Sequence, residues 1–199
     1  MEVNLRKEKF LKESNIAIIE FKSISRGLLV TDEILKASKV RLLLATTLCP
    51  GKYLTIVGGD VAAVEKTIDI ANLIGGRHVF SSTVVSGIGP EVINAISGKS
   101  VELLNDAISI IESLNMANII NAADISIDSA KVEIVELRLG RGCGVNCFYI
   151  ITGTLTAVEE ATDNAVLFLK DTGSLIAYRV IPNPDKDLLK WVAPSICSC

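Results

Sequence analysis

Asn15-Ile16-Ala17-Ile18-Ile19-Glu20 is repeated later in the chain as Ala107-Ile108-Ser109-Ile110-Ile111-Glu112, with the two glutamates 112 − 20 = 92 residues apart. The tetrapeptide ASKV at residues 37–40 returns at that same spacing as SAKV at residues 129–132. The tripeptide AVE at residues 63–65 returns at residues 157–159, a spacing of 159 − 65 = 94. The chain is therefore an internal repeat of two copies, with a single two-residue insertion predicted between Val40 and Val64 of the first copy.

The residue pattern of each copy predicts the order strand, helix, strand, strand, helix, strand. Short apolar runs, several of them bounded by Pro or Gly, indicate the strands. They are expected at residues 16–21, 40–45, 53–57 and 79–85 in the first copy, and at residues 108–111, 132–137, 148–152 and 175–181 in the second. Short terminal helices are expected at residues 90–96 and 185–191. This βαββαβ order is typical of a ferredoxin-like α+β module.

Apolar residues at helical spacing predict the faces with which the longer helices meet each sheet. In the first copy these faces are Ile24, Leu28 and Leu35, then Val64, Ile68 and Ala71. In the second copy they are Met116, Ile119, Ile120, Ala123 and Ile127, then Val158, Ala161, Ala165 and Phe168. Asp60 and Thr154 precede the second helix of each copy and are expected to cap it.

Composition excludes several classes of function. The chain has 199 residues and a net charge of −3, whereas nucleic-acid binders usually carry a basic excess. No stretch approaches the ~18 apolar residues of a membrane span, and residues 1–13 are rich in charge with no signal-peptide core. Mean hydropathy is +0.45, so we expect apolar surface to be buried between subunits. An enzyme is not expected, because the sequence has no phosphate-binding glycine loop, no paired histidines and no plausible catalytic triad.

Five cysteines, Cys49, Cys143, Cys147, Cys197 and Cys199, occur in the chain. An odd number without a signal peptide fits a reducing cytosol better than a disulfide framework. Cys147 begins a predicted strand and is expected in the core. The terminal Cys197-Ser198-Cys199 is a soft-metal motif or a frayed end. The single histidine, His78, is given no function.

Two motifs resemble bacterial microcompartment shell proteins. Residues 18–23, IIEFKS, resemble the opening strand of that family, which ends in Glu before Thr-Lys-Gly, and residues 180–185, VIPNPD, resemble its closing Val-Ile-Pro-Arg-Pro-His. Two such modules resemble the tandem-domain members, which form trimers shaped like hexagonal tiles. The resemblance implies a homotrimer in a microcompartment shell within the cytoplasm. It also implies contacts with other shell proteins and allows docking of encapsulated enzymes.

The expected domains are an N-terminal extension at residues 1–14, a first shell module at 15–100, a second at 101–193 and a Cys-containing tail at 194–199. The junction is expected between Gly98 and Asn105. The resemblance makes Lys22 a contact at the edge of the tile. The second copy has Leu114 at the equivalent of Lys22 and Asn183 in place of the family's arginine, so edge contacts are expected from the first copy alone.

Residues 48–53, LCPGKY, resemble the pore loop of the propanediol-utilisation type of trimeric shell protein. The resemblance implies that Cys49 of each subunit binds a [4Fe-4S] cluster on the trimer axis, for electron transfer or cluster transport across the shell. A cubane cluster normally takes four thiolates, and one cysteine per chain becomes three in a trimer. On the residues alone, the favoured interpretation of Cys49 is a small, half-buried residue in a hairpin turn, and the cluster depends on the resemblance.

The pore loop is expected to comprise Leu48, Pro50, Gly51 and Lys52 with Arg141, Gly142 and Gly144 of the second copy. Cys143 lies in that second loop. Three interpretations of it stay open: an auxiliary ligand, a redox-active thiol or an ordinary turn residue. Lys52 and Arg141 either place positive charge at the pore mouth or are solvated loop charges. Two alternatives to the cluster-binding tile stay open: a plain metabolite pore, and a ferredoxin-like regulator that binds a small ligand.

Overall fold

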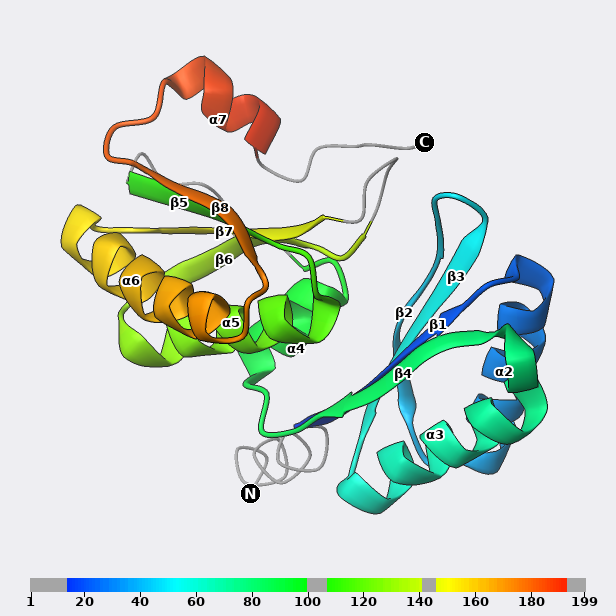
Figure 1. The fold of residues 1–199 in the computed structure, drawn as a ribbon. Coiled ribbons are helices and arrows are strands. Elements are labelled where there is room, and N and C mark those ends of the chain that lie inside the picture. The colour runs from blue at the N-terminus through cyan, green and yellow to red at the C-terminus, as the bar shows by residue number, and fades with distance from the viewer. Residues whose placement is uncertain (1–13, 100–106, 141–145, 193–199) are drawn as a thin grey trace. The chain divides into compact units, whose positions relative to one another are not determined.

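The computed structural model describes residues 14–99, 107–140 and 146–192, and these fall into two compact units that divide between Ile93 and Asn94. Each unit contains one four-stranded antiparallel sheet with helices packed on it (Figure 1). The predicted extension at residues 1–14, the module boundary at residue 100 and the tail at residues 194–199 lie almost wholly outside the described residues. No helix in the described ranges is long and apolar enough to cross a membrane.

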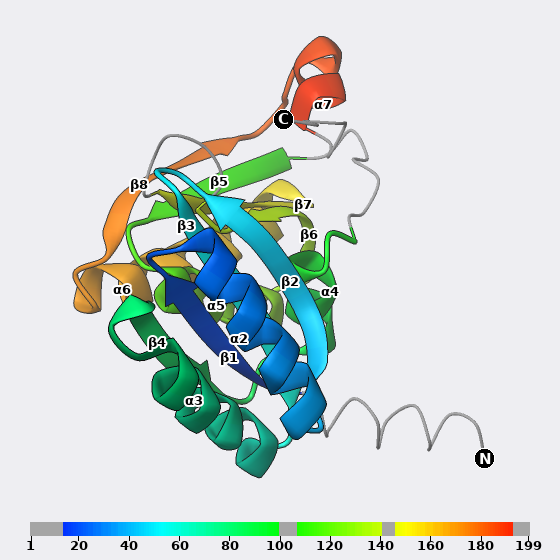
Figure 2. The same ribbon diagram turned by 90° about the vertical axis from the view of Figure 1, so that its right-hand side faces the viewer.

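The first unit has the predicted βαββαβ order. Its elements are β1 (Asn15–Phe21), α2 (Ile24–Ala37), β2 (Arg41–Leu48), β3 (Lys52–Gly59), α3 (Val61–Gly75), the 3₁₀ turn η1 (Gly76–His78) and β4 (Val79–Val85). The short helix α4 (Pro90–Ile96) follows. The strands are ordered β2-β3-β1-β4, as in a ferredoxin-like sheet. Both long helices, α2 and α3, lie on one face of this sheet (Figure 2).

The second unit repeats the first. Its elements are β5 (Ala107–Ser113), α5 (Met116–Ser129), β6 (Glu133–Arg138), β7 (Cys147–Gly153), α6 (Leu155–Asp171), β8 (Leu175–Ile181) and α7 (Lys186–Val192). The strand order β6-β7-β5-β8 matches that of the first sheet. Irregularities in the ladders recur as well, between Leu42 and Leu44 in β2 and between Ile134 and Glu136 in β6. The two copies therefore share strand register as well as topology.

The predicted two-residue insertion lies in the turn between the second and third strands. Leu48 pairs with Lys52 across a turn of residues 49–51, whereas residues 141–145 separate the corresponding positions 140 and 146. The prediction of only one insertion was nevertheless wrong. Val85 lies opposite Ile16 and Ile181 lies opposite Ile108, so the offset at the last strand is 181 − 85 = 96. The second insertion accompanies the longer helix α6, which has 17 residues against 15 in α3.

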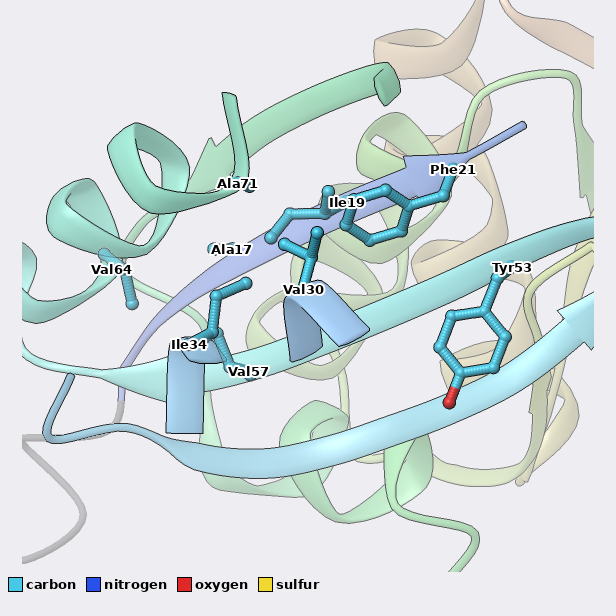
Figure 3. Packing of buried hydrophobic residues seen from close by; sticks show 9 residues of the cluster. All are labelled: Ala17, Ile19, Phe21, Val30, Ile34, Tyr53, Val57, Val64 and Ala71. Atoms are coloured by element: carbon cyan, nitrogen blue, oxygen red, sulfur yellow. The ribbon is translucent and has the colours of Figure 1, made fainter. Parts of the chain in front are cut away.

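The first core lies between the sheet and its two helices. Alternate residues of β1, Ala17, Ile19 and Phe21, point toward Val30 and Ile34 of α2 (Figure 3). Such alternation follows from the two-residue period of a strand. The predicted α3 face is confirmed, since Val64 and Ala71 are in this core and Ile68 packs against it.

The predicted core face of α2 was wrong. Ile24, Leu28 and Leu35 are 38%, 53% and 38% exposed. The buried side of the helix is instead formed by Gly27, Val30, Thr31 and Ile34. Helical spacing predicts which residues share one face of a helix, but α2 has apolar residues on two of its faces. The face that contains the small residue Gly27 is the one that packs against the sheet.

In the second unit both faces of the sheet are covered. Ser109 of β5 accepts a hydrogen bond from Thr162 of α6 at 2.8 Å, so this side of the strand faces the long helices. Its neighbour Ile108 points to the other face, where it clusters with Ile150 and with Leu189 of α7. The predicted faces of α5 and α6 are confirmed at most positions. Three predicted residues, Met116, Ile127 and Phe168, are only partly buried. The others are fully buried: Ile119, Ile120, Ala123, Val158, Ala161 and Ala165.

Candidate functional site: the Cys49 hairpin

The turn between β2 and β3 consists of Cys49, Pro50 and Gly51, all of which are exposed. Gly51 has a φ of 76°, a left-handed conformation that glycine adopts readily because it has no Cβ. The Cys49–Pro50 peptide bond is cis, a geometry that proteins use in tight turns. Leu48, the last residue before the turn, is buried. The hairpin therefore presents a cysteine side chain at the end of a firmly paired ladder.

Cys49 has the chemistry of an iron–sulfur ligand, because such clusters are held by cysteine thiolates. Among the described residues, no group of three or more His, Cys, Asp or Glu side chains is close enough to hold a metal ion. Within the described part of the chain the hairpin offers one exposed thiol, so a cluster bound there would need further ligands, which the same thiol of other chains could supply. The exposure of Cys49 on a three-residue turn fits a ligand of that kind.

Lys52 begins β3, and its ammonium is held by other strands. Its Nζ lies 3.5 Å from Oε2 of Glu20 in β1 and 3.3 Å from the centroid of the Phe80 ring in β4. The second carboxylate oxygen of Glu20 accepts a hydrogen bond from Ser81 Oγ at 2.9 Å. Lys52 is therefore paired within its own sheet and is not a freely solvated loop charge.

Three partners of this hairpin were not predicted from the sequence: Glu20, Phe80 and Ser81. Glu20 was visible as the end of the repeated motif, but nothing in the sequence placed Phe80 beside Lys52. That proximity arises from the order β3-β1-β4, which brings residues 28 positions apart, 80 − 52, onto one end of the sheet.

The second predicted half of the pore loop, Arg141, Gly142, Cys143 and Gly144, lies outside the described residues. The flanking strands show that this segment joins β6 and β7 as the Cys49 turn joins β2 and β3. Cys147 is confirmed as a core residue: it is fully buried at the start of β7.

The remaining predicted positions lie away from this turn in sequence. Lys22 is exposed just after β1, and its backbone N–H donates to the carbonyl of His78 at 2.8 Å. Its counterpart Leu114 is exposed, as is Asn183. Asp60 caps α3 as predicted, accepting from the Ala63 N–H at 2.8 Å. Thr154 is the N-cap residue of α6, as predicted, but its side chain makes no capping hydrogen bond.

Comparisons with known proteins agree with this architecture. The BMC domain matches residues 15–88 and again residues 107–184. The chain is 33% identical to the bacterial microcompartment shell protein PduT of Citrobacter freundii, over 87% of this chain and 94% of PduT. It is 31% identical to the shell protein PduA of the same organism over 46% of this chain and 96% of PduA.

A solved structure has a similar fold over most of this chain. The crystal structure of a microcompartments protein from Desulfitobacterium hafniense superimposes with a TM-score of 0.84 at 35% identity, covering 88% of this chain and 98% of that one. With both BMC matches and a relative aligned along nearly its whole length, this chain belongs to the bacterial microcompartment shell proteins, as a member with two BMC domains in tandem.

Proposed function

We propose that three copies of this chain form a tile of a microcompartment shell in the bacterial cytoplasm, and that the Cys49 hairpins of the three copies meet at a central pore. There, one Cys49 thiolate from each subunit would bind a [4Fe-4S] cluster. The observation that carries the proposal is the exposed Cys49 on a three-residue turn of a regular hairpin, with no further metal-binding group beside it among the residues that the structure describes.

The exposed apolar surface supports association. Ile24, Leu28 and Leu29 are exposed on α2 although they are large aliphatic residues. Contiguous apolar surface of this kind is typical of protein–protein contacts. Two similar modules per chain also suit a ring in which three chains supply six similar units.

A bound cluster would supply one-electron redox chemistry at the pore, for electron transfer or for carrying a cluster across the shell. Cys49 would hold it through its thiolate. Three chains supply three such ligands, and the fourth iron would take a non-protein ligand or another residue such as Cys143. Leu48, Pro50 and Gly51 shape the turn that presents the thiol.

The test is oxygen-free purification and reconstitution of the wild type and Cys49→Ser, with iron and sulfide assays and absorption spectra. We expect about four irons per three chains in the wild type and their loss in Cys49→Ser. Cys197→Ser is the matched control and should retain full iron, whereas a partial loss in Cys143→Ser would identify an auxiliary ligand.

Other outcomes separate the alternatives. Colourless wild-type trimers that stay colourless after reconstitution would leave a tile with a plain metabolite pore. A Cys49→Ser trimer with full iron would refute the ligand assignment. A stable monomer would contradict the tile itself and favour a small-ligand regulator.

A further inference from the structure

A cluster of charged and aromatic side chains lies at the base of the Cys49 hairpin, outside the turn itself. It consists of Lys52, Glu20, Phe80 and Ser81, contributed by strands β3, β1 and β4. Lys52 contacts both the Glu20 carboxylate and the face of the Phe80 ring, and Ser81 holds the other oxygen of that carboxylate. We call these four residues the hairpin anchor.

The geometry of the hairpin anchor opposes movement of the turn. The Lys52 and Glu20 side chains are only 25% and 15% exposed, so the ion pair is better shielded than a typical surface pair. The Lys52 ammonium over the face of the Phe80 ring adds a second, weaker attraction, because Phe80 is itself 54% exposed. Lys52 is also the residue paired with buried Leu48. Both residues that flank the turn are therefore held in place.

The second copy shows that the fold does not require this anchor. Glu112 occupies the position of Glu20, but the offsets of 94 and 96 place Asn146, Ile176 and Ala177 where the first copy has Lys52, Phe80 and Ser81. The β6-β7-β5-β8 sheet forms nonetheless. The anchor thus accompanies the hairpin that carries Cys49 and is dispensable for the sheet.

We propose that Lys52 is a positioning residue for Cys49. Held by Glu20 and Phe80, it fixes the direction of the hairpin, so that the Cys49 thiols of associated chains converge with the spacing a cluster needs. This inference rests on the proposed function for its purpose, but the anchoring of the turn is measurable without any cluster.

The test compares Lys52→Met, which keeps the length of the side chain and removes its charge, with Lys52→Arg, which restores a cation for the carboxylate and the ring. Lys36→Met is the matched control, because Lys36 also pairs with a carboxylate, Asp32, but on an exposed face of α2. Phe80→Leu is a second variant that keeps the ion pair and removes the ring. Circular dichroism establishes that each variant folds.

Two readouts are followed. Hydrogen exchange of the turn amides in cluster-free protein should be about three- to fivefold faster in Lys52→Met than in wild type, and unchanged in Lys36→Met. After reconstitution, the reduced cluster of Lys52→Met should give a broadened electron paramagnetic resonance signal with less than the wild-type iron. Lys52→Arg should recover both properties.

The outcomes distinguish this inference from the proposed function. If exchange in both Lys52→Met and Phe80→Leu equals that of Lys36→Met, the anchor does not hold the turn and the inference is overturned. If hydrogen exchange of the turn amides is faster in Lys52→Met than in wild type, but wild type takes up no iron, the anchor is supported and the cluster proposal fails. If hydrogen exchange of the turn amides is faster in Lys52→Met, but its iron content and electron paramagnetic resonance signal equal those of wild type, the positioning role is overturned.

Discussion

At Gly27, helix α2 leaves no room for a side chain between its backbone and Tyr53 of β3. A Cβ added there would lie 2.6 Å from Cδ1 and 2.8 Å from Cβ of Tyr53, closer than real contacts allow. The second copy carries Ile119 and Cys147 at the corresponding positions, both fully buried. In the first copy the helix supplies the small residue and the strand the large one, and in the second copy the sizes are reversed. The total side-chain volume between helix and sheet therefore stays similar.

We predict that Gly27→Ala destabilises the protein by about 1–3 kcal/mol despite the better helix propensity of alanine, because the overpacked Tyr53 cannot move away at its Cβ. Urea unfolding measures the change. In a Tyr53→Cys background, kept reduced, the cost of Gly27→Ala should fall, since the two positions contact each other. Equal costs in both backgrounds would show that Tyr53 is not the limiting contact.

Tyr149 makes stability sensitive to alkaline pH. Burial raises the pKa of its phenol well above the ordinary value of 10.0, while the hydroxyl stays hydrogen-bonded to Ser126 Oγ at 2.7 Å. Above pH 10 the unfolded chain loses this proton and the folded chain keeps it, so the unfolded state binds fewer protons and stability falls with rising pH.

We predict that this single group contributes a loss of up to about 1.4 kcal/mol per pH unit above pH 10. Tyr149→Phe should show a shallower decline in unfolding free energy between pH 10 and 11 than the wild type. Ser126→Ala keeps the phenol and should retain the steep decline. A wild-type slope in Tyr149→Phe would mean that other groups dominate alkaline unfolding.

At the scale of the elements, α3 and α6 start alike in sequence and differ in their caps. Asp60 accepts a hydrogen bond from the Ala63 N–H, satisfying one of the unpaired donors at the start of α3. The Thr154 hydroxyl lies 3.5 Å from that of Thr156 and makes no such bond with the first turn of α6.

We therefore predict unequal effects from the same substitution. Asp60→Ala should lower the free energy of unfolding by about 1 kcal/mol, the usual cost of a lost N-cap. Thr154→Ala should change it by less than about half of that, because no capping bond is lost. Chemical denaturation of the two variants in parallel gives the comparison, and equal losses would contradict the assignment of the caps.

At the scale of the whole molecule, we expect the exposed aliphatic residues of α2 to be buried when chains associate. Native mass spectrometry should find a trimer of 3 × 21.3 = 63.9 kDa. Leu28→Glu, which places a charge on that exposed face, should shift the population toward monomers, because burying an unpaired charge is costly. Wild-type monomers at micromolar concentration would contradict the tile.

The sequence by itself determined the repeat, the βαββαβ order and the BMC family, because these depend on patterns written along the chain. For the strands at residues 79–85 and 175–181, both the first and the last residue were predicted correctly. Cys147 was placed in the core correctly. Most other strand ends were one to three residues too short, since ladder pairing extends strands beyond their most apolar positions.

Only the tertiary structure decided which stripe of α2 is buried, where the second insertion falls and what holds Lys52. Each of these depends on contacts between segments distant in the sequence. Gly27 must meet Tyr53 before one stripe is preferred, and Lys52 must meet Glu20 and Phe80 across three strands before its charge is paired. Periodicity along one segment specifies its own faces, whereas the partner of each face is set by the ordering of strands in the folded sheet.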